Sequence, residues 1–159
     1  MTLTRDEVVR GAMAVLSSEG AAALSMRRVA RELGVSPMAL YNHVENRADL
    51  VDAICESFLR WTFDEPGTIA EQATNLFEGY RRWPYMREIV REANPELLRQ
   101  ASAVVVRRAV PDEAGDDAVT RAAEDWAIAS ALAGGLAGEM YVDGAAAFTR
   151  AVAALNRPG

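Results

Sequence analysis

The residues best suited to chemistry lie between positions 25 and 44, where the pattern points to DNA recognition. Ser25 can cap a short helix, Gly34 interrupts it, and Ser36-Pro37 can start a second helix. Proline at the first helical position loses no intrahelical bond, and glycine permits the left-handed backbone that a sharp turn needs. This order is typical of a helix-turn-helix, whose second helix enters the major groove.

The expected outward face of the second helix carries side chains that can meet base edges. Asparagine can bond adenine bidentately, and apolar side chains can touch the thymine methyl. Residues 21–47 hold four arginines against two glutamates, whereas the whole chain has a net charge of −6. The same spacing also fits an αα-hairpin within any helical protein. The candidate groove-facing residues are Ser36, Pro37, Met38, Ala39, Tyr41, Asn42 and His43.

Catalytic and metal-binding patterns are not found in the sequence. The one histidine, His43, and the one cysteine, Cys55, fall in different expected helices. We therefore expect no enzyme, no cofactor and no metal site. Cys55 is best interpreted as a small buried side chain, with redox sensing as the alternative. A single cysteine cannot form an internal disulfide, and the longest uncharged stretch, 126–138, is shorter than the roughly 18 residues of a membrane span. We expect a cytoplasmic protein without membrane contact.

The elements that position these residues are all expected to be helices, because apolar residues recur at helical spacing and no strand alternation is seen. We predict an all-α fold with a helix-turn-helix domain at 1–46, a connecting helix at 47–63 and a helical domain at 64–159. Proline, glycine and acidic residues mark loops at 64–67 and 111–117. The expected helices cover residues 5–19, 26–33, 37–44, 47–61, 68–82, 85–92, 95–109, 118–141 and 144–155.

Residues 4–58 resemble the N-terminal domain of the tetracycline-repressor (TetR) family of bacterial transcriptional regulators. The resemblance rests on the strings AMAVLSSEGAAAL and LSMRRVARELGVSPMALYNHVENRADLVDAI, of which ALYNHVENRADL is the most specific. It implies a three-helix DNA-binding domain followed by a helical domain for ligand binding and dimerisation. The implied function is a homodimeric repressor that a small molecule releases from a palindromic operator. The alternative is a ligand-binding or protein-interaction module whose helix-turn-helix is degenerate.

The resemblance also implies roles for individual residues. Ser25 and Arg27 match positions that touch phosphate or a base edge, and Pro37, Met38 and Ala39 match base-reading positions. Tyr41, His43 and Arg47 match phosphate contacts. Apolar side chains at 37–39 replace the family's polar readers, so specificity is expected to rest on Arg27 and Asn42. Arg28 is included among the DNA-binding candidates for its charge, although a solvated face explains it equally well.

The resemblance further implies an effector pocket and a dimer interface in residues 64–159 and the preceding helix end. The ligand is expected to be a small apolar or aromatic molecule, and tetracycline itself is not expected because this part of the chain has no histidine. Simple core packing is the other interpretation of the aromatic residues. A helix end or kink at Gly134 is the other interpretation of the small residues that are expected to form the dimer interface. The pocket candidates are Trp61, Phe77, Tyr80, Trp83 and Trp126, and the interface candidates are Ala127, Ala131, Gly134 and Gly138.

Overall fold

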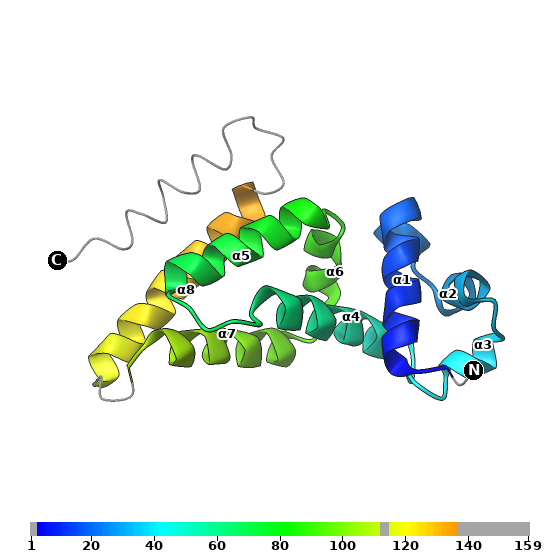
Figure 1. The fold of residues 1–159 in the computed structure, drawn as a ribbon, viewed down its shortest axis with the longest axis horizontal. Helices are drawn as coiled ribbons and strands as arrows, with labels where there is room; N and C mark the ends of the chain where they lie inside the picture. The colour runs from blue at the N-terminus through cyan, green and yellow to red at the C-terminus, as the bar shows by residue number, and fades with distance from the viewer. Residues whose placement is uncertain (1–2, 112–114, 137–159) are drawn as a thin grey trace. The chain divides into compact units, whose positions relative to one another are not determined.

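The computed structural model describes residues 3–111 and 115–136, and every regular element within them is helical (Figure 1). This confirms the all-α prediction. The expected helix at 144–155, and the end of the preceding helix at 141, lie outside the described residues. In chain order the elements are α1 (Arg5–Glu19), a 3₁₀ turn η1 (Ala21–Ala23), α2 (Met26–Leu33), α3 (Pro37–Leu40), α4 (Arg47–Thr62), α5 (Ile69–Arg82), α6 (Met86–Glu92), α7 (Pro95–Ala109) and α8 (Asp116–Leu136).

The chain divides into two compact units. The first unit comprises Met1–Phe58 and Tyr85–Asn94, and the second comprises Leu59–Pro84 and Pro95–Gly159. Helix α6 therefore belongs to the first unit, although the sequence placed residues 64–159 together. The end of α6 is tied to α4, because the backbone N–H of Asn94 donates to Asp52 Oδ1 at 2.8 Å.

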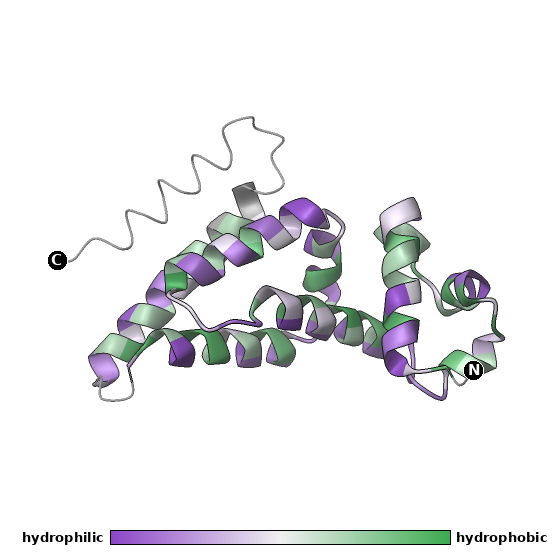
Figure 2. Ribbon diagram, in the orientation of Figure 1, coloured by the Kyte–Doolittle hydropathy of each residue, from purple (hydrophilic) through white to green (hydrophobic). Residues whose placement is uncertain are grey.

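The first unit begins with a helix whose ends follow local rules. The Thr4 hydroxyl accepts from the backbone N–H of Glu7, and the Glu7 carboxylate accepts from the backbone N–H of Thr4, as the predicted capping box requires. The helix stops at Gly20. Figure 2 shows that these helices mix hydrophilic and hydrophobic residues along their length, as amphipathic helices do. The largest fully buried side chains of this unit are Val8, Val15, Leu16, Val29, Leu40, Val44, Leu50, Ile54, Phe58, Met86 and Ile89.

A glycine brings α1 close to α2. A methyl group added at Gly11 would lie 2.7 Å from two carbon atoms of the Leu33 side chain. Real side chains do not approach so closely, so the packing of α1 on α2 depends on the missing Cβ. Ala30 of α2 is buried as well. Gly11 was not among the residues singled out from the sequence.

The second unit is built from α5, α7 and α8, with α8 packed along both of the others. Thr68 and Glu71 form a second capping box at the start of α5. Ala129 and Ala133 are completely buried, so small side chains let α8 approach a neighbouring helix within the chain. No helix of the described residues is long and apolar enough to cross a membrane.

Candidate nucleic-acid interface

The helix-turn-helix is shaped by three capping interactions. The Ser25 hydroxyl accepts from the backbone N–H of Arg28, and the Ser36 hydroxyl accepts from that of Ala39, both at 3.3 Å. Between them, Gly34 has φ of 66° in the left-handed region, which ends α2 and turns the chain. In both caps the hydroxyl oxygen accepts, so Ser25 and Ser36 position the helices that carry the other candidates, and each keeps its hydroxyl proton to donate.

The recognition helix is shorter than the sequence predicted. It was expected to run to Val44, but α3 ends at Leu40 and continues as a hydrogen-bonded turn. The carbonyl of Leu40 accepts from the backbone N–H groups of both His43 and Val44, at 2.8 and 3.0 Å. Such bifurcated bonds tighten a helix end. Asn42 and His43 therefore lie in the turn after α3.

The start of α3 is presented on the surface. Met38 is 72% exposed and Tyr41 is 47% exposed, whereas Leu40 between them is completely buried. Pro37 and Asn42 are also exposed, and Ala39 and His43 are partly buried. The exposed side of α3 is therefore the side that carries the groove-facing candidates, and its most prominent side chain is apolar.

The arginines of α2 differ in their availability. Arg27 is exposed and makes no ion pair or side-chain hydrogen bond with any residue that the structure describes. Arg28 bonds the carboxylates of Glu19 and Glu32, and these bonds raise its pKa further. Arg27 is free to meet a phosphate or a base, while Arg28 joins α2 to the end of α1. The structure thus favours the surface-face interpretation of Arg28.

Arg47, the expected phosphate contact at the start of α4, already has protein partners. Its Nε donates to the backbone carbonyl of Leu24 at 3.1 Å. Its Nη1 lies 2.5 Å from Glu92 Oε2, at the end of α6. Both side chains of this ion pair are partly exposed, at 43% and 41%. A phosphate would have to compete with Glu92 for the guanidinium.

A network centred on Arg5 holds the segment between α3 and α4. Arg5 donates to the backbone carbonyl of His43 at 2.8 Å and to Asp49 Oδ1 at 2.9 Å. Asp49 also accepts from the backbone N–H of Glu45 at 2.8 Å. The hydrogen bond from Arg5 is the largest cause that lowers the pKa of Asp49. This network was not predictable from the sequence, because Arg5 and Asp49 are 44 positions apart and no local pattern connects them.

Cys55 is completely buried in α4. Burial is the largest cause that raises the pKa of its thiol to about 12, and Asp52, Glu56 and Glu92 add to it. Because the thiolate is the reactive form, this environment supports the interpretation of Cys55 as a packed side chain.

Comparison with known proteins assigns this helix-turn-helix to a family. The model of "Bacterial regulatory proteins, tetR family" matches residues 8–54, which include most of α1, all of α2 and α3, and the first half of α4. The helix-turn-helix segment belongs to the TetR family. This confirms the resemblance found in the sequence and the order of a helix-turn-helix followed by a helical domain.

Individual relatives extend the comparison. The HTH-type transcriptional repressor DrrR1 of Streptomyces coeruleorubidus is 33% identical over 97 residues, which are 55% of this chain and 36% of DrrR1. The match thus spans about a third of the length of this curated relative. The structure of BioQ with its double-stranded DNA operator is 22% identical, covers 98% of this chain and 99% of that one, and has a TM-score of 0.69. The structure of Streptomyces coelicolor ActR in complex with actinorhodin is 30% identical, covers 85% of this chain and 66% of that one, and has a TM-score of 0.56.

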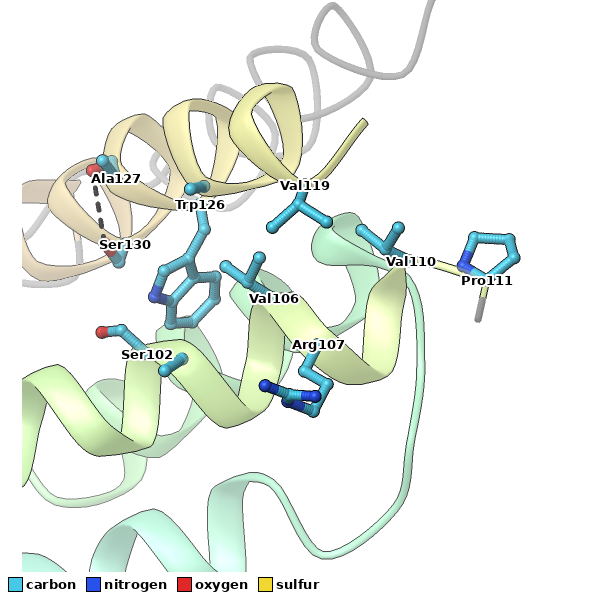
Figure 3. Close-up of a pocket in the computed structure, with 11 residues that line it drawn as sticks. Ser102, Val106, Arg107, Val110, Pro111, Val119, Trp126, Ala127 and Ser130 are labelled. Atoms are coloured by element: carbon cyan, nitrogen blue, oxygen red, sulfur yellow. Dashed lines mark hydrogen bonds between the residues drawn. The ribbon is translucent and has the colours of Figure 1, made fainter. Parts of the chain in front are cut away.

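The aromatic residues expected to line an effector pocket fall into separate groups. Trp61 packs edge to face on Trp83, with ring centroids 4.6 Å apart. Phe77 and Tyr80 are buried. Trp126 lines a cavity of about 760 Å³ between α7 and α8 (Figure 3), and the other four do not.

This cavity was not anticipated in its location. Most of its walls come from Val106, Val110, Pro111 and Val119, together with alanines of both helices. Valines at helical spacing carry no signal that separates a cavity wall from a packed core, so only aromatic residues were predicted to line a pocket.

The expected interface residues are distributed along α8. Ala127 and Ala131 are exposed, and Gly134 is partly buried. A methyl group added at Gly134 would lie 3.9 Å from the ring of Tyr80, so this glycine faces α5 of the same chain. Gly138 lies outside the described residues. Ala127 also lines the cavity between α7 and α8. The dimer interface remains a prediction for all four residues.

Proposed function

We propose that this protein is a homodimeric transcriptional repressor that binds a palindromic DNA operator in the cytoplasm and is released by a small molecule. The observation that carries the proposal is the helix-turn-helix itself, with the start of α3 exposed and with Arg27 beside it unpaired among the described residues. The names of DrrR1 and of the operator-bound BioQ structure support it. These relatives are regulators, so we assign the chain no catalytic role.

The candidate contacts are assigned to two roles. Arg27 and Asn42 read base edges, since both are exposed and carry hydrogen-bonding groups that suit guanine and adenine. Met38 contacts thymine methyl groups. Tyr41, His43 and Arg47 bind phosphates, which position the protein without reading sequence.

The test compares two exposed arginines of the same helix. A duplex retained from a genomic fragment library serves as operator, and a scrambled duplex of equal length serves as random DNA. Arg27→Ala should lower operator affinity by about 1–3 kcal/mol and relax base preference at one position of each half-site. Arg31→Ala is the matched control, because Arg31 is also exposed and also unpaired within the described residues. Equal losses on operator and random DNA for Arg27→Ala would show that it is not a base reader.

The dimer is tested at α8. Sedimentation at micromolar concentration should give twice the mass of one chain. Ala131→Glu should weaken association without unfolding the protein, because Ala131 is exposed. The control is Thr120→Glu, an exposed position nearer the start of the same helix. A monomeric parent protein would contradict the proposal, and an unaffected Ala131→Glu variant would place the interface elsewhere.

A further inference from the structure

The cavity between α7 and α8 has the size and lining of a small-molecule site. Its volume of about 760 Å³ falls within the roughly 300–1,000 Å³ of ligand pockets. Figure 3 shows Val106 and Val119 approaching Trp126 from the two helices, with Val110 and Pro111 at one end. This wall favours a flat or chain-like apolar group.

The charge of the lining has one sign. Arg107 is the only charged residue among the eleven described residues that line the cavity, and none of these eleven is a carboxylate. Arg107 forms no ion pair with any described residue, although the neighbouring Arg108 donates to the carbonyl of Phe63 at 2.9 Å. The rim of the cavity therefore carries an exposed positive side chain, and the described part of the chain supplies no counter-ion for it.

The hydrogen-bonding groups of the lining also favour a ligand rich in acceptors. The hydroxyl protons of Ser102 and Ser130 are already donated to backbone carbonyls of Leu98 and Ala127. The indole N–H of Trp126 makes no hydrogen bond with a described residue, and Figure 3 shows it on the side of the ring toward Ser102. Among the described lining residues, the donors without a partner are thus the Trp126 indole and the Arg107 guanidinium, which together suit a ligand rich in acceptors.

We propose that this cavity binds a small carboxylate with an apolar body, with Arg107 paired to the carboxylate and the body seated against Trp126 and the valines. Arginine binds carboxylates through two parallel hydrogen bonds, which fixes their orientation. The role of this ligand as effector rests on the proposed function, but its binding to the cavity does not. The site can therefore be tested on the protein in the absence of DNA.

The experiment uses two probes of nearly the same shape, 2-naphthoate and the neutral 2-naphthylmethanol, titrated calorimetrically at pH 7.5. Arg107→Gln should weaken 2-naphthoate about tenfold and leave 2-naphthylmethanol unchanged. Arg121→Gln is the matched control, because Arg121 lies on α8, is exposed and does not line the cavity. Ala123→Leu, which places a larger side chain at the wall, should weaken the binding of both probes.

Three results would overturn the proposal. They are no binding of 2-naphthoate by the parent protein, equal losses in Arg107→Gln and Arg121→Gln, and unchanged binding in Ala123→Leu. The proposed function is tested separately on operator DNA. If 2-naphthoate binds as described but leaves the operator complex intact at saturation, the site stands and release by this ligand class does not. If the protein binds no DNA, the repressor assignment fails while the calorimetry still decides the site.

Discussion

Glu92 is expected to restrain DNA binding by holding Arg47. The carboxylate of Glu92 lies 2.5 Å from Arg47 Nη1, and the same guanidinium donates to the carbonyl of Leu24. A phosphate at the start of α4 gains Arg47 only when the Glu92 contact is lost or shared. Glu92→Gln removes the competing charge and keeps the shape of the side chain, so it should strengthen binding.

The size of the gain follows from the exposure of the pair. Both side chains are about two-fifths exposed, so solvent screens their attraction. Exposed ion pairs of this kind contribute about 0.2–1 kcal/mol. The affinity should therefore rise by about 1.4-fold to 5-fold in Glu92→Gln. Because phosphates carry no sequence information, operator and random DNA should gain equally.

Fluorescence anisotropy with both duplexes at several salt concentrations measures this effect. The plot of log affinity against log salt should become steeper in Glu92→Gln, by up to about one phosphate contact. Glu88→Gln is the matched control, because Glu88 is an exposed carboxylate on the same helix and pairs with no described residue. Adding Arg47→Gln to Glu92→Gln should abolish the gain. Equal effects of the two glutamate substitutions would refute competition between Glu92 and phosphate for Arg47. Weaker binding by Glu92→Gln would also refute it, and would show that Glu92 orients Arg47 toward phosphate.

Three further predictions concern the framework of the first unit. Gly11→Ala should destabilise it by about 1–3 kcal/mol in chemical denaturation, because the new methyl overlaps Leu33. The double variant with Leu33→Ala should lose less stability than the sum of the two single losses, because the shortened side chain makes room for the methyl. Gly34→Ala should cost about 1 kcal/mol and weaken operator binding, because φ of 66° strains any residue with a Cβ. Asp49→Asn should lower stability at neutral pH. Because Arg5 lowers the pKa of Asp49, its contribution is present above about pH 4 and is lost as the pH falls through the folded-state pKa. The difference from the parent protein should therefore shrink in acid-unfolding curves below about pH 4; a difference that stays constant there would exclude the ion pair as its source.

The sequence predicted those features that depend on neighbouring residues. Thr4 and Ser36 start helices by accepting from backbone N–H groups three residues on, and Gly34 ends one through its own backbone. The family motif likewise lies within one continuous stretch. Local signals of this kind are readable in a single sequence.

Features that depend on distant residues were not predictable in this way. Arg5 and Asp49 meet across 44 positions, and Arg47 and Glu92 across 45. Nothing in the composition near any of them indicates its partner. The end of α3 was misplaced for a related reason, since the apolar spacing continues to Val44 while the carbonyl of Leu40 closes the helix.

The assignment of Tyr85–Asn94 to the first unit has consequences for how the protein folds during synthesis and for how its gene can recombine. As the chain leaves the ribosome, the helix-turn-helix is complete long before Glu92 and Asn94 can reach Arg47 and Asp52. A fragment ending near residue 63, or a chimera joined there to another ligand domain, would carry the DNA-reading helices without these two contacts. Exchange of ligand domains between relatives should therefore preserve function best when residues 85–94 travel with the N-terminal segment.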